Sequence, residues 1–191
     1  MFARTERLIL RPSWPEDAAP LAKALSNPDI ARNLLNVPAH YDETEAHRWI
    51  ERQRDPRLPE FLSFMRTRGG ASRLVGGVAI SRRADGELEL GYWVERSLWG
   101  LGFATEATRA VMRIARATGL IVRAGHFLDN PSSARVLRKI GFRPTGRVES
   151  RVSRGRASEV SMALFEYDES LAPPRDEPAF ELYRDAMPAM A

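Results

Sequence analysis

The chain has 191 residues, a formal net charge of +4 and no cysteine. This length suits one domain, and a hydrophobic fraction of 43% argues against disordered and collagen-like classes. The lack of cysteine excludes disulfides, thiolate metal sites and a cysteine nucleophile. The three histidines have no metal-binding spacing, so no metal is expected. No apolar run approaches the roughly 20 residues of a membrane span and no secretory pattern is present, so we expect a cytoplasmic protein without a membrane partner.

The N-terminal part predicts one strand and two helices. Residues 7–11 have the apolar pattern of a short buried strand, and Ser13 and Glu16 have the spacing of a capping box for a helix over 18–25. Asp42 is the predicted N-cap of a second helix, which is expected to end near Gln53. The chain is therefore expected to begin its sheet with one strand and to cover it with two helices.

The rest of the chain predicts a meander followed by alternating strands and helices. The predicted elements are strands at 61–67, 74–81 and 87–94, a helix at 104–118, a strand at 120–128, a helix at 132–140, and strands at 145–152 and 159–167. This order predicts an α+β fold whose mixed, mostly antiparallel sheet has about seven strands, with helices on both faces. We expect one domain over residues 1–170 and an acidic C-terminal extension over 171–191. In that extension Phe180, Leu182, Tyr183 and Met187 suggest a small helix.

Positive charge is concentrated in the middle of the chain. Residues 96–156 hold thirteen basic and three acidic residues. Such a segment attracts polyanions, either a phosphorylated cofactor or a nucleic acid. A solvated helix face explains part of the pattern equally well, because Arg109, Arg113 and Arg116 share one face of a predicted helix. Aromatic residues do not interleave these arginines, so a nucleic-acid partner is not expected.

A glycine-rich turn joins the strand at 87–94 to the long helix. Gly100 and Gly102 allow a tight turn and a close approach of a ligand, and the helix start offers free N–H groups and a positive dipole end. These features predict a phosphate site, with a turn that binds nothing as the alternative. A Walker A loop does not fit, because Gly-Lys-Ser/Thr is missing. A dinucleotide fingerprint does not fit either, because Thr105 stands at its sixth position and the turn lies mid-chain.

Two segments resemble motifs of the GCN5-related N-acetyltransferase (GNAT) superfamily. The stretch Trp99-Gly-Leu-Gly-Phe-Ala104 is similar to its pyrophosphate loop, Gln/Arg-x-x-Gly-x-Gly/Ala, except that Trp99 replaces Gln/Arg. The stretch from Asn130 to Phe142 is similar to a later motif, Asn-x-x-Ser-x-x-x-Leu-x-x-x-Gly-Phe. Thr5–Arg11 and Glu89–Trp93 further resemble the RimJ/RimL-like branch, the ribosomal-protein N-terminal acetyltransferase type. The resemblance spans about residues 5–168.

The resemblance implies where acetyl-CoA binds. It implies a GNAT fold whose sheet is splayed in the middle, with acetyl-CoA as co-substrate in a V-shaped opening between the strands that end near Val94 and Leu128. Backbone N–H groups of the glycine turn would enclose the diphosphate. The implied cofactor-binding residues are Trp93, Val94, Glu95, Trp99, Gly100, Leu101, Gly102, Phe103, Ala104, Thr105, Asn130 and Ser133. The candidates for binding the 3′-phosphate of the nucleotide are Arg135, Arg138 and Lys139. The alternative is that these side chains form a solvated helix face.

The implied reaction is a direct attack of an amine on the thioester, which suits a chain without cysteine. Val94 is expected to donate its N–H to the oxyanion. Glu89 is the candidate catalytic base, with an ordinary strand residue as the alternative, and His126 is a second candidate as base or water holder. Leu137 stands where many members carry a Tyr that acts as general acid. Ser133, the second candidate catalytic residue, or a water molecule is therefore expected to serve the departing sulfur.

The expected acceptor is a protein N-terminal α-amine, and a small-molecule amine is second. An α-amine has a pKa of about 7.7–8.0, against about 10.4 for lysine, so it needs less help from a base. Two further classes stay open: a catalytically silent acyl-CoA-binding module, and a nucleic-acid binder that uses the arginine-rich segment. A monomer or a homodimer is expected.

Overall fold

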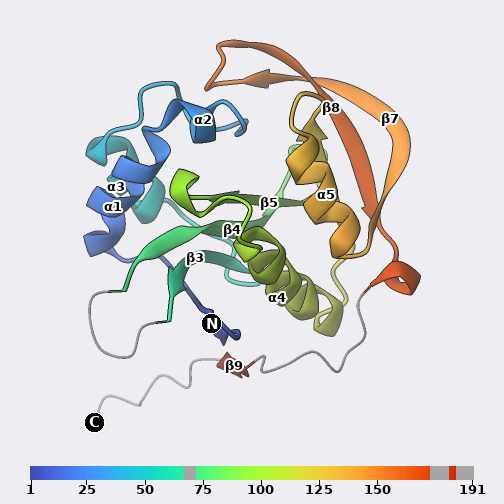
Figure 1. Cartoon of the computed structure of the whole chain (residues 1–191), viewed down its shortest axis with the longest axis horizontal. Coiled ribbons are helices and arrows are strands. Elements are labelled where there is room, and N and C mark those ends of the chain that lie inside the picture. Colours follow the sequence, from blue (N-terminus) through green and yellow to red (C-terminus); the bar gives the residue numbers. More distant parts are fainter. Residues whose placement is uncertain (67–71, 173–180, 184–191) are drawn as a thin grey trace.

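The computed structural model describes residues 1–66, 72–172 and 181–183. Within these residues nine strands form one sheet in the order β7-β8-β6-β5-β4-β3-β2-β1-β9, with helices on both faces (Figure 1). The strands are β1 (Phe2–Arg4), β2 (Leu8–Arg11), β3 (Glu60–Met65), β4 (Leu74–Arg82), β5 (Leu88–Val94), β6 (Val122–Phe127), β7 (Phe142–Ser153), β8 (Ser158–Tyr167) and β9 (Glu181–Tyr183). The α-helices are α1 (Ala18–Leu25), α2 (Pro28–Ala31), α3 (Glu43–Glu51), α4 (Phe103–Ala117) and α5 (Pro131–Lys139). Three short 3₁₀ helices are η1 (Pro15–Asp17), η2 (Arg96–Leu98) and η3 (Glu169–Leu171).

The predicted α+β class is confirmed, the predicted strands and helices of residues 7–167 differ from the observed ones by at most three residues at each end, and the short helix α2 was not predicted. The sheet has nine strands rather than about seven, because β1 and β9 add to one edge. The helix predicted in the C-terminal extension is wrong for residues 181–183, which form β9 and pair with β1. Phe180 and Met187 lie outside the described residues.

The capping box predicted for Ser13 and Glu16 is also wrong. Asp17 fills that role at the start of η1, because its carboxylate accepts the N–H of Trp14 at 2.7 Å. The same carboxylate pairs with Arg11 of β2 at 2.7 Å. The carboxylate accepts from a backbone N–H and also pairs with a nearly buried cation. This makes it a more stable cap at this helix start than a serine hydroxyl would be.

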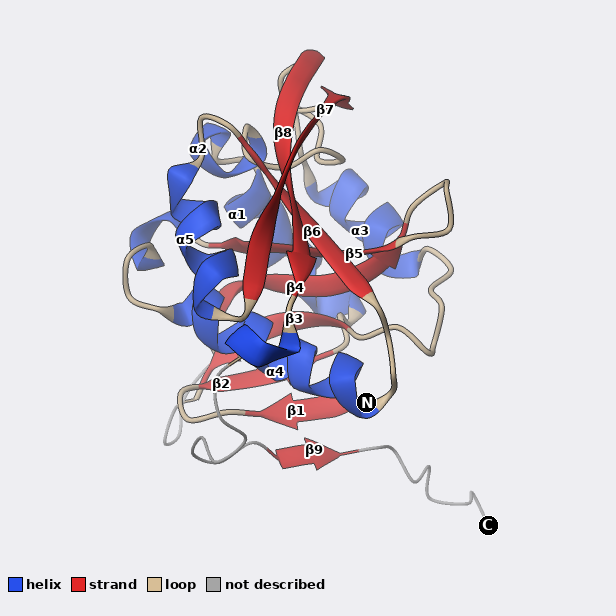
Figure 2. Ribbon diagram, turned by 90° about the vertical axis from the view of Figure 1, so that its right-hand side faces the viewer, coloured by secondary structure: helices blue, strands red, loops and turns tan. Residues whose placement is uncertain are grey.

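The sheet opens between β5 and β6. Among the described residues these two strands are the only parallel pair, and all other neighbouring strands are antiparallel. The pairing of β5 with β6 stops at Leu90 and Ala124, although β5 continues to Val94 and β6 to Phe127. Figure 2 shows β6, β7 and β8 turned steeply against β1–β5. The carboxyl ends of β5 and β6 therefore diverge, which confirms the predicted splay in the middle of the sheet.

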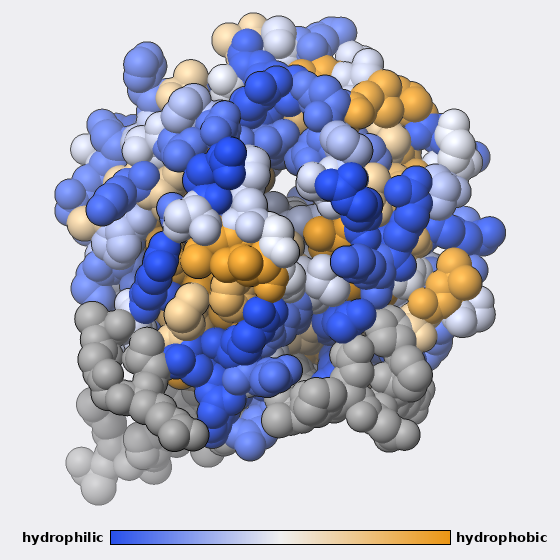
Figure 3. Space-filling model, in the orientation of Figure 1, coloured by the Kyte–Doolittle hydropathy of each residue, from blue (hydrophilic) through white to orange (hydrophobic). Residues whose placement is uncertain are grey.

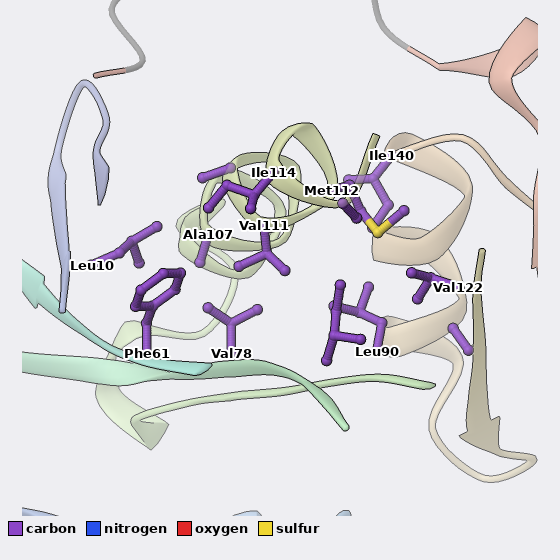
Figure 4. Close-up of a cluster of buried hydrophobic side chains, with 14 of the residues drawn as sticks. Leu10, Phe61, Val78, Leu90, Ala107, Val111, Met112, Ile114, Val122 and Ile140 are labelled. Carbon is purple, nitrogen blue, oxygen red and sulfur yellow. The ribbon is translucent and has the colours of Figure 1, made fainter. Parts of the chain in front are cut away.

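Two apolar layers hold the helices on the sheet. On one face α4 packs Ala107, Val111 and Ile114, which recur at helical spacing, over strand residues that include Val78 and Leu90 (Figure 4). On the other face α1 and α3 pack against β3 in a second apolar cluster. Fully burying a single Val, Leu or Ile side chain contributes roughly 1.5–3 kcal/mol. These layers fix the start of α4 beside the end of β5.

Candidate functional site

A cavity of about 500 Å³ lies where β5 and β6 diverge. Its walls are the ends of these two strands, the start of α4, one side of α5, and the loop that follows α2. In the orientation of Figure 1, a hollow opens near the centre of the surface between α2 and α5 (Figure 3). The divergence of the sheet therefore produces an opening that reaches from one face of the sheet to the other.

The start of α4 forms one end of this cavity. Gly100 and Gly102 have φ angles of +80° and +84°, in the left-handed region where glycine is favoured, and Gly102 is the N-cap. The first bond of the helix runs from Glu106 N–H to Gly102 O at 3.1 Å, so the N–H groups before Glu106 have no partner within the helix. Together with the positive dipole end of a 15-residue helix, these groups have the chemistry that binds phosphate.

Trp99 ties the glycine turn to the end of β5. Its indole Nε1–H donates to the carbonyl oxygen of Val94 at 2.7 Å, and Arg96 stacks over its ring at 4.5 Å. A Gln or Arg at this position has donors of its own, so the indole supplies a donor where the motif of the resemblance has another side chain. The departure from that motif therefore keeps a hydrogen-bond donor at the start of the turn.

The last residues of β5 turn a free peptide group toward the opening. Glu95 donates its N–H to Val75 O of β4 at 2.8 Å. Because successive peptide groups of a strand alternate in direction, the N–H of Val94 faces away from β4 and toward β6. Two glycines of β4 allow the end of β5 to lie this close to β4. A Cβ on Gly76 would lie 2.1 Å from Trp93 O, and one on Gly77 would lie 2.6 Å from Trp93 Nε1.

The start of α5 faces the end of β5 across the opening. Asn130 is the N-cap of α5 and accepts the N–H of Ser133 at 3.2 Å. The Tyr92 hydroxyl lies 2.7 Å from the Ser133 hydroxyl and 3.1 Å from Ser133 O, and donates its one hydrogen between these two oxygens. Burial raises the pKa of Tyr92 to about 12, so its hydroxyl stays protonated at neutral pH. The Ser133 hydroxyl is therefore held in a defined position beside the cavity.

Glu89 lines the cavity on the other face of the sheet and is paired with Arg151. Arg151 Nη1 donates to both carboxylate oxygens of Glu89, at 2.9 and 2.8 Å, and the two side chains are only 14% (Arg151) and 16% (Glu89) exposed. Burial disfavours the charged Arg151, but hydrogen bonds with Glu89 and Glu149 outweigh it and keep the pKa of Arg151 above its ordinary value. Glu89 is the one carboxylate among the described residues that line this cavity.

His126 lies on the opposite face of the sheet from Glu89. Its Nδ1 is 2.7 Å from Phe127 O, and its ring is 5.4 Å from Phe165, in the core beneath α5. Phe127 and Met162, the neighbours of Glu89 on the other face, form a separate apolar cluster. The structure therefore places His126 in the lining of the same cavity as Glu89, but on the opposite face of the sheet.

The β7–β8 turn packs against the α2 loop, which lines the cavity on the side where Glu89 lies. Arg154 N–H donates to Leu35 O at 2.8 Å, and Arg156 Nε donates to Arg32 O at 2.7 Å. The turn approaches the α2 loop so closely that a Cβ on Gly155 would lie 2.6 Å from Ala31 O. The turn is not itself part of the cavity lining, so these contacts support the α2 loop from outside the cavity.

The structure brings together most of the residues predicted for the site. Lining the cavity are Glu89, Trp93, Val94, Trp99, Gly100, Gly102, Phe103, Ala104, Thr105, Asn130 and Ser133. Glu95 and Leu101 are not in this lining: Glu95 accepts from Ser97 N–H at 3.1 Å, and the exposed Leu101 offers its carbonyl to Arg7. Arg135 and Lys139 line the cavity, whereas Arg138 lies over the Phe165 ring at 5.7 Å.

Sequence reasoning missed the α2 loop and the place of Tyr92 in the site. Asn33, Leu35 and Asn36 of that loop line the cavity, yet no local pattern distinguishes them from an ordinary surface loop. Tyr92 follows the strand alternation, so its sequence context indicates only sheet packing. In the described residues no three acidic or histidine side chains cluster as metal ligands, and no helix is long and apolar enough to cross a membrane.

Comparison with known proteins gives a consistent picture. A family model described as "Acetyltransferase (GNAT) domain" matches residues 7–143. An uncharacterized N-acetyltransferase of Bacillus licheniformis is 26% identical over 164 residues, covering 83% of this chain and 92% of that protein. The ribosomal-protein-S5-alanine acetyltransferase of Vibrio fischeri superposes with a TM-score of 0.68 at 17% identity, covering 91% of this chain and 100% of the other. The microcin C7 self-immunity acetyltransferase, solved with acetyl-CoA and AMP, has a TM-score of 0.69 at 15% identity, covering 84% of this chain and 92% of the other.

Proposed function

The chain belongs to the GNAT acetyltransferase family and is an acetyl-CoA-dependent N-acetyltransferase; we propose that its acceptor is the α-amine of a protein N-terminus. The observation that carries this proposal is the cavity at the divergence of β5 and β6. It joins the free N–H groups of the glycine turn at one end to the Glu89 carboxylate at the other. Within the family we place the chain in the RimJ/RimL-like branch. In this proposal the protein is a cytoplasmic monomer or homodimer, with the catalytic domain over residues 1–170.

The site residues suit acetyl-CoA, which supplies the activated acetyl group as a thioester. N–H groups of the turn from Gly100 to Thr105 hold the diphosphate, and the cationic side chains of Arg135 and Lys139 line the same cavity. Trp93, Val94 and Glu95 offer strand backbone to the pantetheine arm, and Asn130 and Ser133 contact it from α5. The thioester then lies between Val94 and Ser133.

Three groups of the chain serve the acetyl transfer. As the amine nitrogen bonds to the thioester carbon, Val94 N–H donates to the carbonyl oxygen, where negative charge develops. Glu89, directly or through water, accepts the proton that the amine loses. When the carbon–sulfur bond breaks, the Ser133 hydroxyl, held by Tyr92, donates a hydrogen bond to the departing sulfur, which takes its proton from solvent.

The surroundings of Glu89 favour an α-amine over a lysine amine. Both oxygens of the carboxylate already accept from Arg151, so fewer lone pairs are left for the incoming proton. An amine that is partly neutral at pH 7 is then the better acceptor, which an α-amine with a pKa of about 7.7–8.0 satisfies. The Vibrio fischeri structural neighbour, named as a ribosomal-protein acetyltransferase, is a precedent for such an acceptor on this fold.

A small-molecule amine is the second candidate, because the α2 loop, held by the β7–β8 turn, lines the acceptor side of the cavity and limits access. An acceptor panel with acetyl-CoA distinguishes the two. It contains peptides with a free N-terminus, the same peptides with a blocked N-terminus and an internal lysine, and a set of polyamines and amino acids. Mass spectrometry locates the acetyl group.

We expect acetylation of the free N-termini and none of the blocked peptides. Turnover of small amines alone would overturn the proposed acceptor. Tight CoA binding without turnover of any amine would overturn the catalytic role itself.

Substituting Gly155 by alanine should weaken acceptor binding selectively. The new Cβ meets the Ala31 carbonyl, so the β7–β8 turn must move off the α2 loop. Overpacking of this kind costs about 1–3 kcal/mol, and we expect the acceptor KM to rise about tenfold. The Kd for acetyl-CoA, measured by calorimetry, should stay within about twofold of the parent value.

The matched control for this substitution is Gly146→Ala. Gly146 has a φ of +77° but no heavy atom within 4 Å of a Cβ, so alanine there adds backbone strain without a new contact. An equal rise of the acceptor KM in both variants would mean that the docked turn does not shape the acceptor site.

A further inference from the structure

The β1–β2 turn lies against the start of α4, although about a hundred residues separate the two segments in the sequence. This turn contains Thr5 and Arg7, which belong to the N-terminal motif that the proposed reaction leaves without a task. Glu106, in the first turn of α4, faces them. The contact therefore joins an unexplained motif to the element that carries the glycine turn.

The Glu106 carboxylate is the centre of this contact. One oxygen accepts from the Thr5 hydroxyl at 2.6 Å and from the Arg7 backbone N–H at 2.8 Å, and the other accepts from Arg7 Nε at 2.7 Å. The Glu106 side chain is only 15% exposed. The Arg7 side chain is 42% exposed, so solvent weakens its side of the pair, but all three bonds to the largely buried carboxylate are charge-assisted.

The Arg7 side chain also contacts the glycine turn. Its Nη1 donates to Leu101 O at 2.9 Å, and its guanidinium lies 4.3 Å from the centre of the Phe103 ring. Its Nη2 would lie 3.4 Å from a Cβ on Gly102. One guanidinium therefore touches three successive residues, 101 to 103, that lead into the free N–H groups of α4.

We propose that Arg7 and Glu106 are positioning residues for the diphosphate of acetyl-CoA, acting through Leu101, Gly102 and Phe103. Glycines give this turn conformational freedom that a ligand would otherwise have to remove on binding. Arg7, oriented by Glu106, holds the turn in its binding conformation beforehand. The proposal rests on the proposed placement of the diphosphate at this turn.

Two variants and two probes test the positioning role. Glu106→Gln keeps the shape of the side chain but replaces one acceptor by a donor that faces Arg7 Nε. Arg7→Lys keeps the charge but cannot bond to Glu106 and Leu101 O together. The probes are acetyl-CoA and S-acetylpantetheine, which carries the same thioester without the diphosphate. The control is Glu169→Gln, which breaks an ion pair with Arg116 at the opposite end of α4.

For both variants we expect KM for acetyl-CoA to rise about tenfold, and the Kd for CoA to rise equally. The kcat with acetyl-CoA and kcat/KM with S-acetylpantetheine should stay within about twofold of the parent, as should every value for Glu169→Gln. The double variant should lose less affinity than the product of the single effects, because the two residues act as one unit.

Three outcomes would overturn the proposal. Equal losses with both probes would mean that the contact only stabilises the fold. Parent-like affinity in Arg7→Lys would mean that only its charge acts. Unchanged CoA binding in Glu106→Gln, in a protein whose CoA binding Gly102→Glu strongly weakens, would leave the diphosphate site in place and remove Glu106 from it. Unchanged binding in Gly102→Glu would instead show that the diphosphate site was misplaced.

Discussion

Replacing Gly102 by glutamate is expected to raise the Kd for acetyl-CoA by a factor on the order of 100. Gly102 is the N-cap of α4, and a glutamate there places a carboxylate among the N–H groups that the diphosphate needs. Juxtaposing like charges costs several kcal/mol, and about 2.7 kcal/mol corresponds to a hundredfold change in affinity. Calorimetric titration with CoA measures the effect directly.

Alanine variants separate this charge effect from backbone strain. Gly102→Ala and Gly100→Ala both force an L residue to a φ near +80°, which costs roughly 1–2 kcal/mol without adding charge. We expect a loss of CoA affinity well below that of Gly102→Glu. Equal losses in the glutamate and alanine variants would show that the conformation of the turn matters and the anion site does not.

Replacing Glu89 by glutamine is expected to lower kcat by about 100-fold, with little change in the Kd for acetyl-CoA. Removing a general base typically costs 10²–10⁴-fold in rate. The penalty should be largest at low pH, because the acceptor is then mostly an ammonium and a proton must be removed before attack. The measurement is kcat/KM for an N-terminal peptide as a function of pH.

Glu149→Gln is the matched control for Glu89→Gln. Glu149 also accepts from Arg151, at 2.9 Å, but it is not part of the cavity lining. Its loss disturbs the same arginine without removing the carboxylate beside the acceptor, so we expect near-parent turnover. A pH profile of Glu89→Gln that runs parallel to the parent profile would remove Glu89 from the role of base.

The glycine-turn side of the cavity could be predicted from the sequence because its signals are local. Gly100 and Gly102 indicate the turn, the apolar period after residue 103 indicates the helix, and together they place free N–H groups at one point. Asn130 and Ser133 likewise lie in one short segment, at the start of α5. Local chemistry at fixed spacing is the kind of information a single sequence carries well.

The opposite side of the cavity, around Glu89 and the α2 loop, could not be predicted because it depends on contacts between distant segments. Arg156 bonds to the carbonyl of Arg32, 124 residues away, and a backbone carbonyl leaves no mark in the sequence. The Glu89–Arg151 pair spans 62 residues and the Arg7–Glu106 pair spans 99. Each of these charges is indistinguishable in the sequence from a solvated surface residue.

The C-terminal segment shows how tertiary context overrides a short pattern. Phe180, Leu182, Tyr183 and Met187 have a spacing compatible with a helix, but an isolated helix this short is marginal in water. The outer edge of β1 offers unpaired backbone donors and acceptors, and residues 181–183 satisfy them as β9. Pairing with β1 therefore determines that these residues form a strand, and local sequence propensity contains no information about this pairing.

A crystal structure of the protein with CoA bound tests most directly whether the start of α4 holds the diphosphate. We expect the phosphate oxygens within hydrogen-bond distance of N–H groups between Gly100 and Thr105, and the pantetheine arm between the ends of β5 and β6. Phosphates bound elsewhere on the protein, with the turn from Gly100 to Thr105 making no contact to them, would contradict this placement.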